Sequence, residues 1–247
     1  MAQFLKAGAA GLLLLGVPAL AATQPGVSAF AEAVAGADRP DADKARDADR
    51  KPAGMLAFAG VRPGLKVVEL APGGGYFTRL LSLAVGSNGH VYAVSSRPVP
   101  AVDAWAAAHS NVSVQVAPPG GSLAPEPVDL VWTTQNYHDF KNARAGDTDA
   151  ATATNAAAFA ALKPGGIYLI SDHQGAPGTG ATQTATLHRI KDAAVIREVE
   201  AAGFKFDKRS NILRHPADDH TQKVFETGLR GKTDQFVLRF RKPAARR

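Results

Sequence analysis

Two short polar clusters in this chain of 247 residues contain side chains that can transfer protons or bind cations. The first is Asn-Tyr-His-Asp at residues 136–139, which follows an apolar run at 128–133. The second is Ser-Asp-His at residues 171–173, which follows an apolar run at 166–170. Histidine titrates near neutral pH, and carboxylates accept protons or bind metals. Each cluster could therefore support acid–base or metal chemistry.

A glycine-rich turn forms a third candidate site. Glu69 lies near the end of an apolar run at 65–70, and three consecutive glycines at 73–75 precede an amphipathic segment that begins at Phe77. Glycines leave no side chain above the backbone, and the free N–H groups of a following helix point into the same space. Open α/β sheets bind nucleotides at this position, so a cofactor site is expected, with a purely structural turn as the alternative.

The remaining sequence predicts the elements that position these residues. Strands are expected at residues 65–70, 90–95, 112–116, 128–133, 166–170, 204–207 and 235–240. Helices are expected at residues 77–85, 102–108, 155–162 and 187–202. Strands that alternate with helices form a parallel sheet that is covered on both faces, so the sequence predicts an α/β fold.

The glycine-rich turn resembles motif I of the class I S-adenosylmethionine-dependent methyltransferases, because Glu69 precedes Gly73 by four residues. Dinucleotide enzymes carry G-x-G-x-x-G instead. Residues 162–166 and 200–204 are similar to later segments of the methyltransferase family, and the resemblance covers residues 61–242. The chain looks most like a group of predicted exported methyltransferases that carry an Asn-Tyr-His-Asp motif.

This resemblance implies a Rossmann-like class I methyltransferase fold, with a mostly parallel seven-stranded sheet and helices on both faces. It also implies S-adenosylmethionine as the cofactor, held by Glu69, Ala71, Pro72, Gly73, Gly74, Gly75, Ser95 and Thr133. The sequence departs from the family pattern at three places. Ala71 replaces a glycine, Ser95 stands where an acid usually binds the ribose, and residues 117–119 (Ala-Pro-Pro) replace an acid near the adenine. A neutral serine should hold the ribose less tightly than a carboxylate does.

The Asn-Tyr-His-Asp cluster would border the reactive methyl group in a fold of this type. Methyl transfer is an in-line displacement, so the protein mainly aligns the acceptor, and a base is needed when the acceptor is a hydroxyl or an amide. We interpret His138 as the general base and Asn136 and Tyr137 as positioning groups. Asp139 and Asp172 are expected to face the acceptor as well. The predicted activity is methyl transfer to an oxygen or nitrogen of a small molecule. A cluster that only caps the following helix is the alternative.

A divalent metal is a further hypothesis. Asp139, Asp172 and His173 follow neighbouring strands, as the metal-binding acids do in the similar catechol O-methyltransferase type. Oxygen ligands favour magnesium, whereas histidine ligands favour zinc, manganese or iron. His188 is interpreted as a cap or a packed residue, with substrate contact as the alternative. Residues 218–220 (Asp-Asp-His) are interpreted as a charged surface loop in preference to a metal site.

The chain is predicted to have four regions. Residues 1–21 are typical of a signal peptide that is cleaved after Ala21, because Lys6 is followed by an uncharged run and a small-x-small site. The run is shorter than the roughly 20 residues of a membrane span, so we expect export to the periplasm without a stable span after cleavage; an uncleaved anchor is the alternative. Residues 22–60 are interpreted as a linker and a helical extension, 61–243 as the methyltransferase-like domain, and 244–247 as a basic tail.

Charge and location narrow the expected partners. The net charge is +6, and it becomes +5 if the signal peptide with Lys6 is removed. Basic residues are not interleaved with aromatic ones in a stripe, so a nucleic-acid partner is not expected. Because S-adenosylmethionine is made in the cytoplasm, two alternatives stay open. One is a non-catalytic periplasmic protein that binds a small ligand or a metal on this fold, and the other is a hydrolase or metal enzyme.

Overall fold

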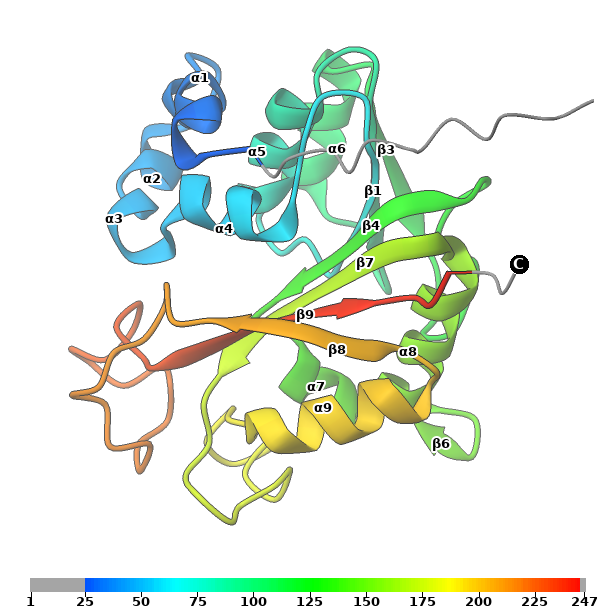
Figure 1. The fold of residues 1–247 in the computed structure, drawn as a ribbon. Coiled ribbons are helices and arrows are strands. Elements are labelled where there is room, and N and C mark those ends of the chain that lie inside the picture. The colour runs from blue at the N-terminus through cyan, green and yellow to red at the C-terminus, as the bar shows by residue number, and fades with distance from the viewer. Residues whose placement is uncertain (1–24, 245–247) are drawn as a thin grey trace, which may run out of the picture.

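The computed structural model describes residues 25–244, and a seven-stranded sheet runs through its middle (Figure 1). The predicted signal peptide and residues 245–247 of the predicted basic tail lie outside the described residues. The strand order is β3-β2-β1-β4-β7-β9-β8. The strands are β1 (Lys66–Leu70), β2 (His90–Ser95), β3 (Val112–Val116), β4 (Val128–Thr134), β7 (Leu162–His173), β8 (Lys205–Ser210) and β9 (Gln235–Arg241).

Most of the sheet is parallel. Strands β1, β2, β3, β4 and β7 run in one direction, and β9 runs antiparallel to its two neighbours, β7 and β8. Strands β2 and β3 follow β1 on one side, and β4 and β7 lie on its other side, so the strand order reverses between β1 and β4. Open α/β sheets bind ligands at such a position. The predicted α/β architecture, with a mostly parallel seven-stranded sheet, is confirmed.

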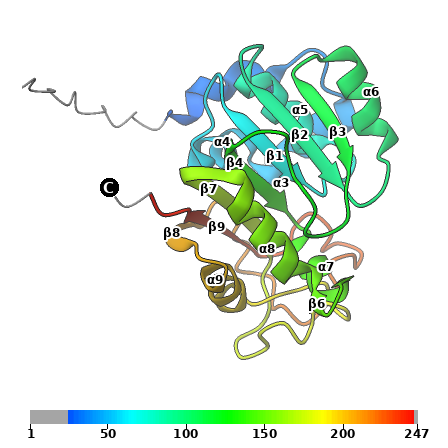
Figure 2. The same ribbon diagram turned by 90° about the vertical axis from the view of Figure 1, so that its right-hand side faces the viewer.

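Helices cover both faces of this sheet (Figure 1). One face carries α4 (Pro52–Ala59), α5 (Tyr76–Val85) and α6 (Pro100–Ala108) over an apolar core that includes Leu80 and Trp132. The other face carries α7 (Tyr137–Asn142), α8 (Ala150–Ala161) and α9 (Asp192–Ala201) over a second core that includes Val131. The hairpin of β5 (Arg144–Ala145) and β6 (Thr148–Asp149) lies beside α7 (Figure 2).

The described part of the N-terminal extension is helical and packed from Val27 onward, where the sequence predicted a linker up to about residue 40. It forms η1 (Val27–Phe30), α1 (Ala31–Ala35), α2 (Asp41–Lys44) and α3 (Asp47–Arg50) ahead of α4. Phe30 is only 3% exposed and joins the core under α4 and α5. Arg79 of α5 pairs with Asp43 at 2.6 Å, so a buried ion pair also fixes the extension to the domain.

Helix α9 begins five residues later than the predicted start at 187. Ile190 explains the difference, because its N–H donates to the carbonyl of His173 at 3.0 Å and ties this stretch to the end of β7. Immediately before it, His188 has a φ of +57°. Backbone in the left-handed region cannot continue a right-handed helix. No helix among residues 25–244 combines the length and the apolar character needed to cross a bilayer.

Candidate functional site

A cavity of about 490 Å³ lies at the carboxyl ends of β1, β2, β3 and β4, and we call it the glycine-side cavity. Ala71 and Gly73 of the glycine-rich turn form part of its wall. Gly73 has a φ of +56°, and a Cβ atom built on it would meet no other atom within 4 Å. The space above the turn is therefore open. Apolar side chains that include Val99, Pro100 and Leu123 line the rest, as a planar aromatic ligand requires.

The end of β2 supplies neutral and basic groups to this cavity. Ser95, Ser96 and Arg97 line it, and the Ser95 hydroxyl accepts a hydrogen bond from the Arg97 N–H at 3.4 Å. Asp139 is the single carboxylate among the described residues of the wall. The cavity thus fits the adenine and the methionine end of S-adenosylmethionine, but its ribose contacts would be hydroxyls and not the usual acid.

Asn136 connects the end of β4 to the glycine-rich turn. Its side-chain amide donates to the carbonyl of Ala71 at 3.0 Å and to that of Thr134 at 2.6 Å. Asn136 occupies the N-cap position of α7, but its side chain makes no capping hydrogen bond. The helix-capping alternative for the polar cluster therefore fails at this residue, which lines the glycine-side cavity instead.

A second cavity, of about 510 Å³, lies on the other side of the end of β4, and we call it the arginine-side cavity. Arg46 and Arg50 from the N-terminal extension line it, together with Arg230 from the segment between β8 and β9. Burial and the charge of Arg46 lower the pKa of Arg50 to about 10, so Arg50 is still charged at neutral pH. Ser171 also lines this cavity, is fully buried, and has a hydroxyl without a hydrogen-bond partner among the described residues. Three arginines in one cavity wall indicate a ligand that carries negative charge.

A cluster of two histidines and an aspartate lies between the two cavities. His138 Nε2 lies 3.3 Å from Asp139 Oδ1 and 3.3 Å from His188 Nδ1. Asp139 belongs to the wall of the glycine-side cavity. The His188 ring packs on Phe225, a residue of the arginine-side wall, with 4.8 Å between the ring centroids. The sequence motif revealed the first two residues; His188 carried no local signal, because it is 50 residues from His138.

Asp172 fixes the ring and the backbone of His138 through two hydrogen bonds. Its Oδ1 lies 2.7 Å from His138 Nδ1, and its Oδ2 accepts from the His138 backbone N–H, also at 2.7 Å. Burial by itself lowers the pKa of His138, but the carboxylates of Asp172 and Asp139 outweigh burial and raise that pKa to about 10. The ring is therefore a cation at neutral pH in this state and cannot accept a proton. This raised pKa argues against His138 as a general base in this state.

Two further expectations change once the side chains are placed. Tyr137 is completely buried, and its hydroxyl donates to Glu198 at 3.0 Å while accepting from Asn155 at 2.9 Å. It therefore faces α8 and α9 and cannot position an acceptor. The predicted metal ligands Asp139, Asp172 and His173 do not converge; among the described residues, His138, Asp139 and His188 form the group that does.

His173 is turned away from the histidine cluster. Its Nδ1 lies 2.7 Å from the hydroxyl of Thr233, and burial lowers its pKa to about 4. The ring is therefore neutral at neutral pH. Its backbone N–H donates to Asp172 Oδ1 at 2.7 Å, so both oxygens of that carboxylate are already engaged. His173 contributes to the wall of the arginine-side cavity.

Some of the predicted cofactor residues line the glycine-side cavity, and the others lie behind its wall. Ala71, Gly73 and Ser95 belong to the cavity wall, whereas Pro72, Gly74, Gly75, Glu69 and Thr133 do not. Thr133 is fully buried, so the cofactor contact expected of its side chain is absent. A glycine is needed at position 75 for a structural reason, because a Cβ atom there would lie 2.8 Å from Nη1 of Arg79. Arg79 in turn donates to the carbonyl of Gly74 at 2.8 Å and so fixes the turn.

Glu69 supports the turn from behind. It is only 3% exposed, and its carboxyl accepts a hydrogen bond from Thr78 of α5 at 2.5 Å. Burial raises its pKa to about 8, although Thr78, Arg50 and Arg79 counteract part of that effect. The carboxyl is therefore largely protonated at neutral pH in the folded protein.

This raised pKa predicts a pH-dependent stability. Between about pH 4.5 and about pH 8 the unfolded chain releases the Glu69 proton while the folded chain keeps it, so the free energy of unfolding should fall as pH rises, by up to about 1.4 kcal/mol per pH unit. Glu69→Gln should remove this slope. Denaturant unfolding of both proteins across that range measures it, and equal slopes would contradict the assignment.

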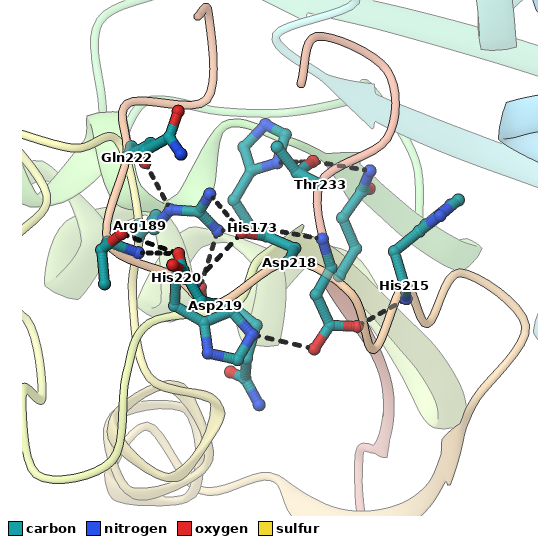
Figure 3. A network of polar contacts seen from close by, with 12 residues as sticks. His173, Arg189, His215, Asp218, Asp219, His220, Gln222 and Thr233 are labelled. Carbon is teal, nitrogen blue, oxygen red and sulfur yellow. Dashed lines mark hydrogen bonds and ion pairs between the residues drawn. The ribbon is translucent and has the colours of Figure 1, made fainter. Parts of the chain in front are cut away.

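The segment between β8 and β9 that completes the arginine-side cavity is fixed by a buried polar network (Figure 3). Arg189 pairs with Asp218 through two contacts of 2.9 and 3.0 Å, and both side chains are at most 2% exposed. Asp234 accepts from Arg214 and from the backbone N–H of His215. The surface-loop interpretation is therefore wrong for Asp218, which is a structural ion-pair partner, and no metal is needed to explain it.

Comparisons with solved structures identify the fold. A SAM-dependent methyltransferase from Aquifex aeolicus matches with a TM-score of 0.59 and 17% identity, over 82% of this chain and 95% of that one. A 1,6-didemethyltoxoflavin-N1-methyltransferase from Burkholderia thailandensis matches with a TM-score of 0.56 and 19% identity, over 88% and 87% of the two chains. The chain has the class I methyltransferase fold.

The same comparisons leave the activity open. The cyclase SpnF is as similar to this chain as the methyltransferases are, with a TM-score of 0.61 and 15% identity over 88% of this chain and 93% of that one. No family model matches the sequence, and no curated protein matches it. At these identities the likeness concerns the fold, and the chemistry has to be argued from the site.

Proposed function

We propose that the protein transfers a methyl group from S-adenosylmethionine to an oxygen or nitrogen of a small-molecule acceptor. The observation that carries this proposal is the end of β4, which separates two cavities. Asn136 lines the glycine-side cavity, while its neighbours Thr134 and Gln135 line the arginine-side cavity. A cofactor in the first cavity and an acceptor in the second would lie on the two sides of this segment, and an in-line displacement requires their reacting atoms to meet there.

The cofactor would be held mainly by backbone and by small polar groups. The open space above Gly73 would accept the methionine end, and the apolar wall would accept the adenine. When bound, S-adenosylmethionine supplies an electrophilic methyl group. Ser95 would contact the ribose without charge assistance, which predicts a modest affinity. Asn136 would orient the turn through its bond to the Ala71 carbonyl.

The acceptor would carry a negative charge. Arg46, Arg50 and Arg230 line its cavity, against the single acid Asp49 among the described wall residues. Arginine binds carboxylates and phosphates through paired N–H groups, so an acceptor with either group is favoured. Catalysis in this proposal relies on alignment of the two reactants and not on His138 as a base.

The proposal includes export to the periplasm, from the signal-peptide pattern of residues 1–21 with cleavage after Ala21. One observation favours a second function, a small-ligand binding protein without methyl transfer. The end of β2 presents Ser95, Ser96 and Arg97 to the glycine-side cavity, so the charged contact that an acid would give to a ribose is missing among the described residues.

A methyl-transfer assay separates the two functions. The full chain would be incubated with S-adenosylmethionine that carries a labelled methyl group and with paired small molecules, each carboxylic acid matched by its neutral amide. We expect label in products of the acid series, because the arginines recognise the anion. Mass spectrometry identifies the products. Transfer to the amides alone would contradict the anionic acceptor, and saturable binding of S-adenosylhomocysteine without any transfer would favour the binding protein.

A further inference from the structure

We propose that His138, Asp139 and His188 form a zinc site with three protein ligands. The ligand atoms are His138 Nε2, Asp139 Oδ1 and His188 Nδ1, and they come from α7 and from the segment before α9. No other group of three such ligands converges among residues 25–244. The site is distinct from the expected Asp139, Asp172 and His173 set, and it does not depend on methyl transfer.

The spacing of the three atoms fits tetrahedral coordination. The distances between them are 3.3 Å (His138–Asp139), 3.3 Å (His138–His188) and 3.6 Å (His188–Asp139). Around a tetrahedral zinc ion with bonds of about 2.0–2.2 Å, neighbouring ligand atoms are about 3.3–3.6 Å apart. Octahedral magnesium with bonds of about 2.0–2.1 Å would need them about 2.8–3.0 Å apart. The triangle therefore matches the ligand spacing of zinc better than that of magnesium.

His138 has the hydrogen-bonded carboxylate partner that metal-binding histidines usually have. His138 Nδ1 faces Asp172 Oδ1 at 2.7 Å, so the carboxylate fixes that nitrogen as the donor, and a zinc ion at Nε2 would displace the proton that this nitrogen carries. Asp172 itself is fully buried and accepts from the backbone N–H groups of His138 and His173. Its oxygens are therefore engaged, and it acts as a positioning residue and not as a fourth ligand.

The backbone of His188 is strained. It is a non-glycine residue with a φ of +57°, a conformation that costs free energy and persists where the surrounding structure enforces it. Arg189 enforces it from one side through the pair with Asp218, and Phe225 packs on the ring from the other. The strained backbone places Nδ1 at the third corner of the triangle.

The three ligands leave a fourth position open. His138 is buried, whereas the side chains of His188 and Asp139 are 30% and 54% exposed. A zinc ion with three protein ligands and one exchangeable position is the arrangement of catalytic sites, where water or a substrate oxygen occupies the fourth place. The chemical class of ligand for that position is therefore a neutral or anionic oxygen donor.

Calorimetric titration of the metal-free full chain with zinc chloride tests the proposal. We expect one zinc ion per chain. Asp139→Asn and His188→Asn should each lower the affinity at least about 10-fold, and asparagine is chosen at 188 because it tolerates a left-handed backbone. His90→Gln is the matched control. The His90 ring contacts Ser113 at the amino-terminal ends of β2 and β3, so this substitution should leave zinc binding unchanged.

Asp172→Asn should weaken zinc binding by about 10–100-fold, as loss of a carboxylate behind a ligating histidine does. The cobalt-substituted protein supplies a readout that a purely structural role would not change, because four-coordinate cobalt absorbs visible light far more strongly than six-coordinate cobalt. Circular dichroism confirms that each variant is folded. A folded chain that binds no zinc, or Asp139→Asn and His188→Asn variants with unchanged affinity, would overturn the site and leave the methyl-transfer proposal standing.

Discussion

Replacing Asp218 with asparagine should destabilise the protein by about 3–5 kcal/mol, because the change leaves the guanidinium of Arg189 buried without its counter-ion. Arg189 is completely buried and touches both oxygens of Asp218. It also donates to the carbonyls of Gln174 and Gln222, but neither carbonyl neutralises its charge. Denaturant unfolding at neutral pH measures the loss.

Asp219→Asn is the matched control for this variant. Asp219 is the exposed neighbour of Asp218, and its contacts are confined to Thr221 two residues away. Its replacement should leave the unfolding midpoint close to that of the unmodified chain. Equal stability losses in the two variants would show that the buried pair has no special role.

The pH dependence of stability gives a second readout for the same pair. Burial by itself raises the pKa of Asp218, but hydrogen bonds from Arg189 and from backbone N–H groups outweigh burial and hold that pKa below its usual value. Stability from this carboxylate is therefore present at neutral pH and is lost as pH falls through the folded-state pKa. Asp218→Asn should remove that part of the acid-induced loss.

Gly73→Asp should weaken binding of S-adenosylhomocysteine by about 100-fold or more, equivalent to about 2.7 kcal/mol. The new side chain would extend into the open space above the turn, where the methionine end of the ligand is expected. A second carboxylate beside the ligand carboxylate adds repulsion as well as volume.

Gly64→Asp controls for backbone strain. Gly64 has a φ of +82°, compared with +56° at Gly73, and a Cβ atom at either position meets nothing within 4 Å. Gly64 lies in the turn before β1 and not in the cavity wall. Both variants carry an aspartate in a strained backbone conformation. A loss of S-adenosylhomocysteine affinity in Gly73→Asp alone would therefore come from the position of the side chain and not from strain. Binding that survives in Gly73→Asp would place the ligand elsewhere.

Strands could be predicted well because their signal is local. The apolar runs at 90–95 and 112–116 coincide with β2 and β3 to the residue, and turn residues bound both. The glycine-rich turn could also be predicted, since three consecutive glycines between a strand and a helix favour a turn that leaves open space above the backbone. A parallel sheet follows from the alternation of strands and helices, and the neighbours of β4 follow from the fold class.

The site residues contributed by distant segments could not be predicted. Arg46 and Arg50 belong to a stretch of mixed charge that is typical of a solvated helix. In the structure, contacts of Asp43 and Asp47 with Arg79 and Tyr76 of α5 hold that stretch beside the arginine-side cavity. His188 reaches the polar cluster only because Ile190 pairs with β7 and Arg189 is buried. Contacts of this kind depend on tertiary packing between distant segments, and such packing produces no recognisable residue spacing in the sequence.

The pKa of His138 shows the same limit. The motif predicted a ring that titrates near neutral pH, and the structure gives a buried ring between two carboxylates, with a pKa raised to about 10. Asp139 was adjacent in the sequence, but Asp172 is 34 residues away and its contact required the pairing of β4 with β7. The environment of a titratable group decides its chemistry, and that environment is assembled by the fold.

Calorimetric titration of the full chain with S-adenosylhomocysteine is the most direct test of the central claim, which is that the glycine-side cavity binds the cofactor. We predict saturable binding of one ligand per chain, with a modest affinity because Ser95 replaces a carboxylate at the ribose. Absence of binding by a protein shown to be folded would contradict the claim. It would leave a methyltransferase fold that serves another ligand.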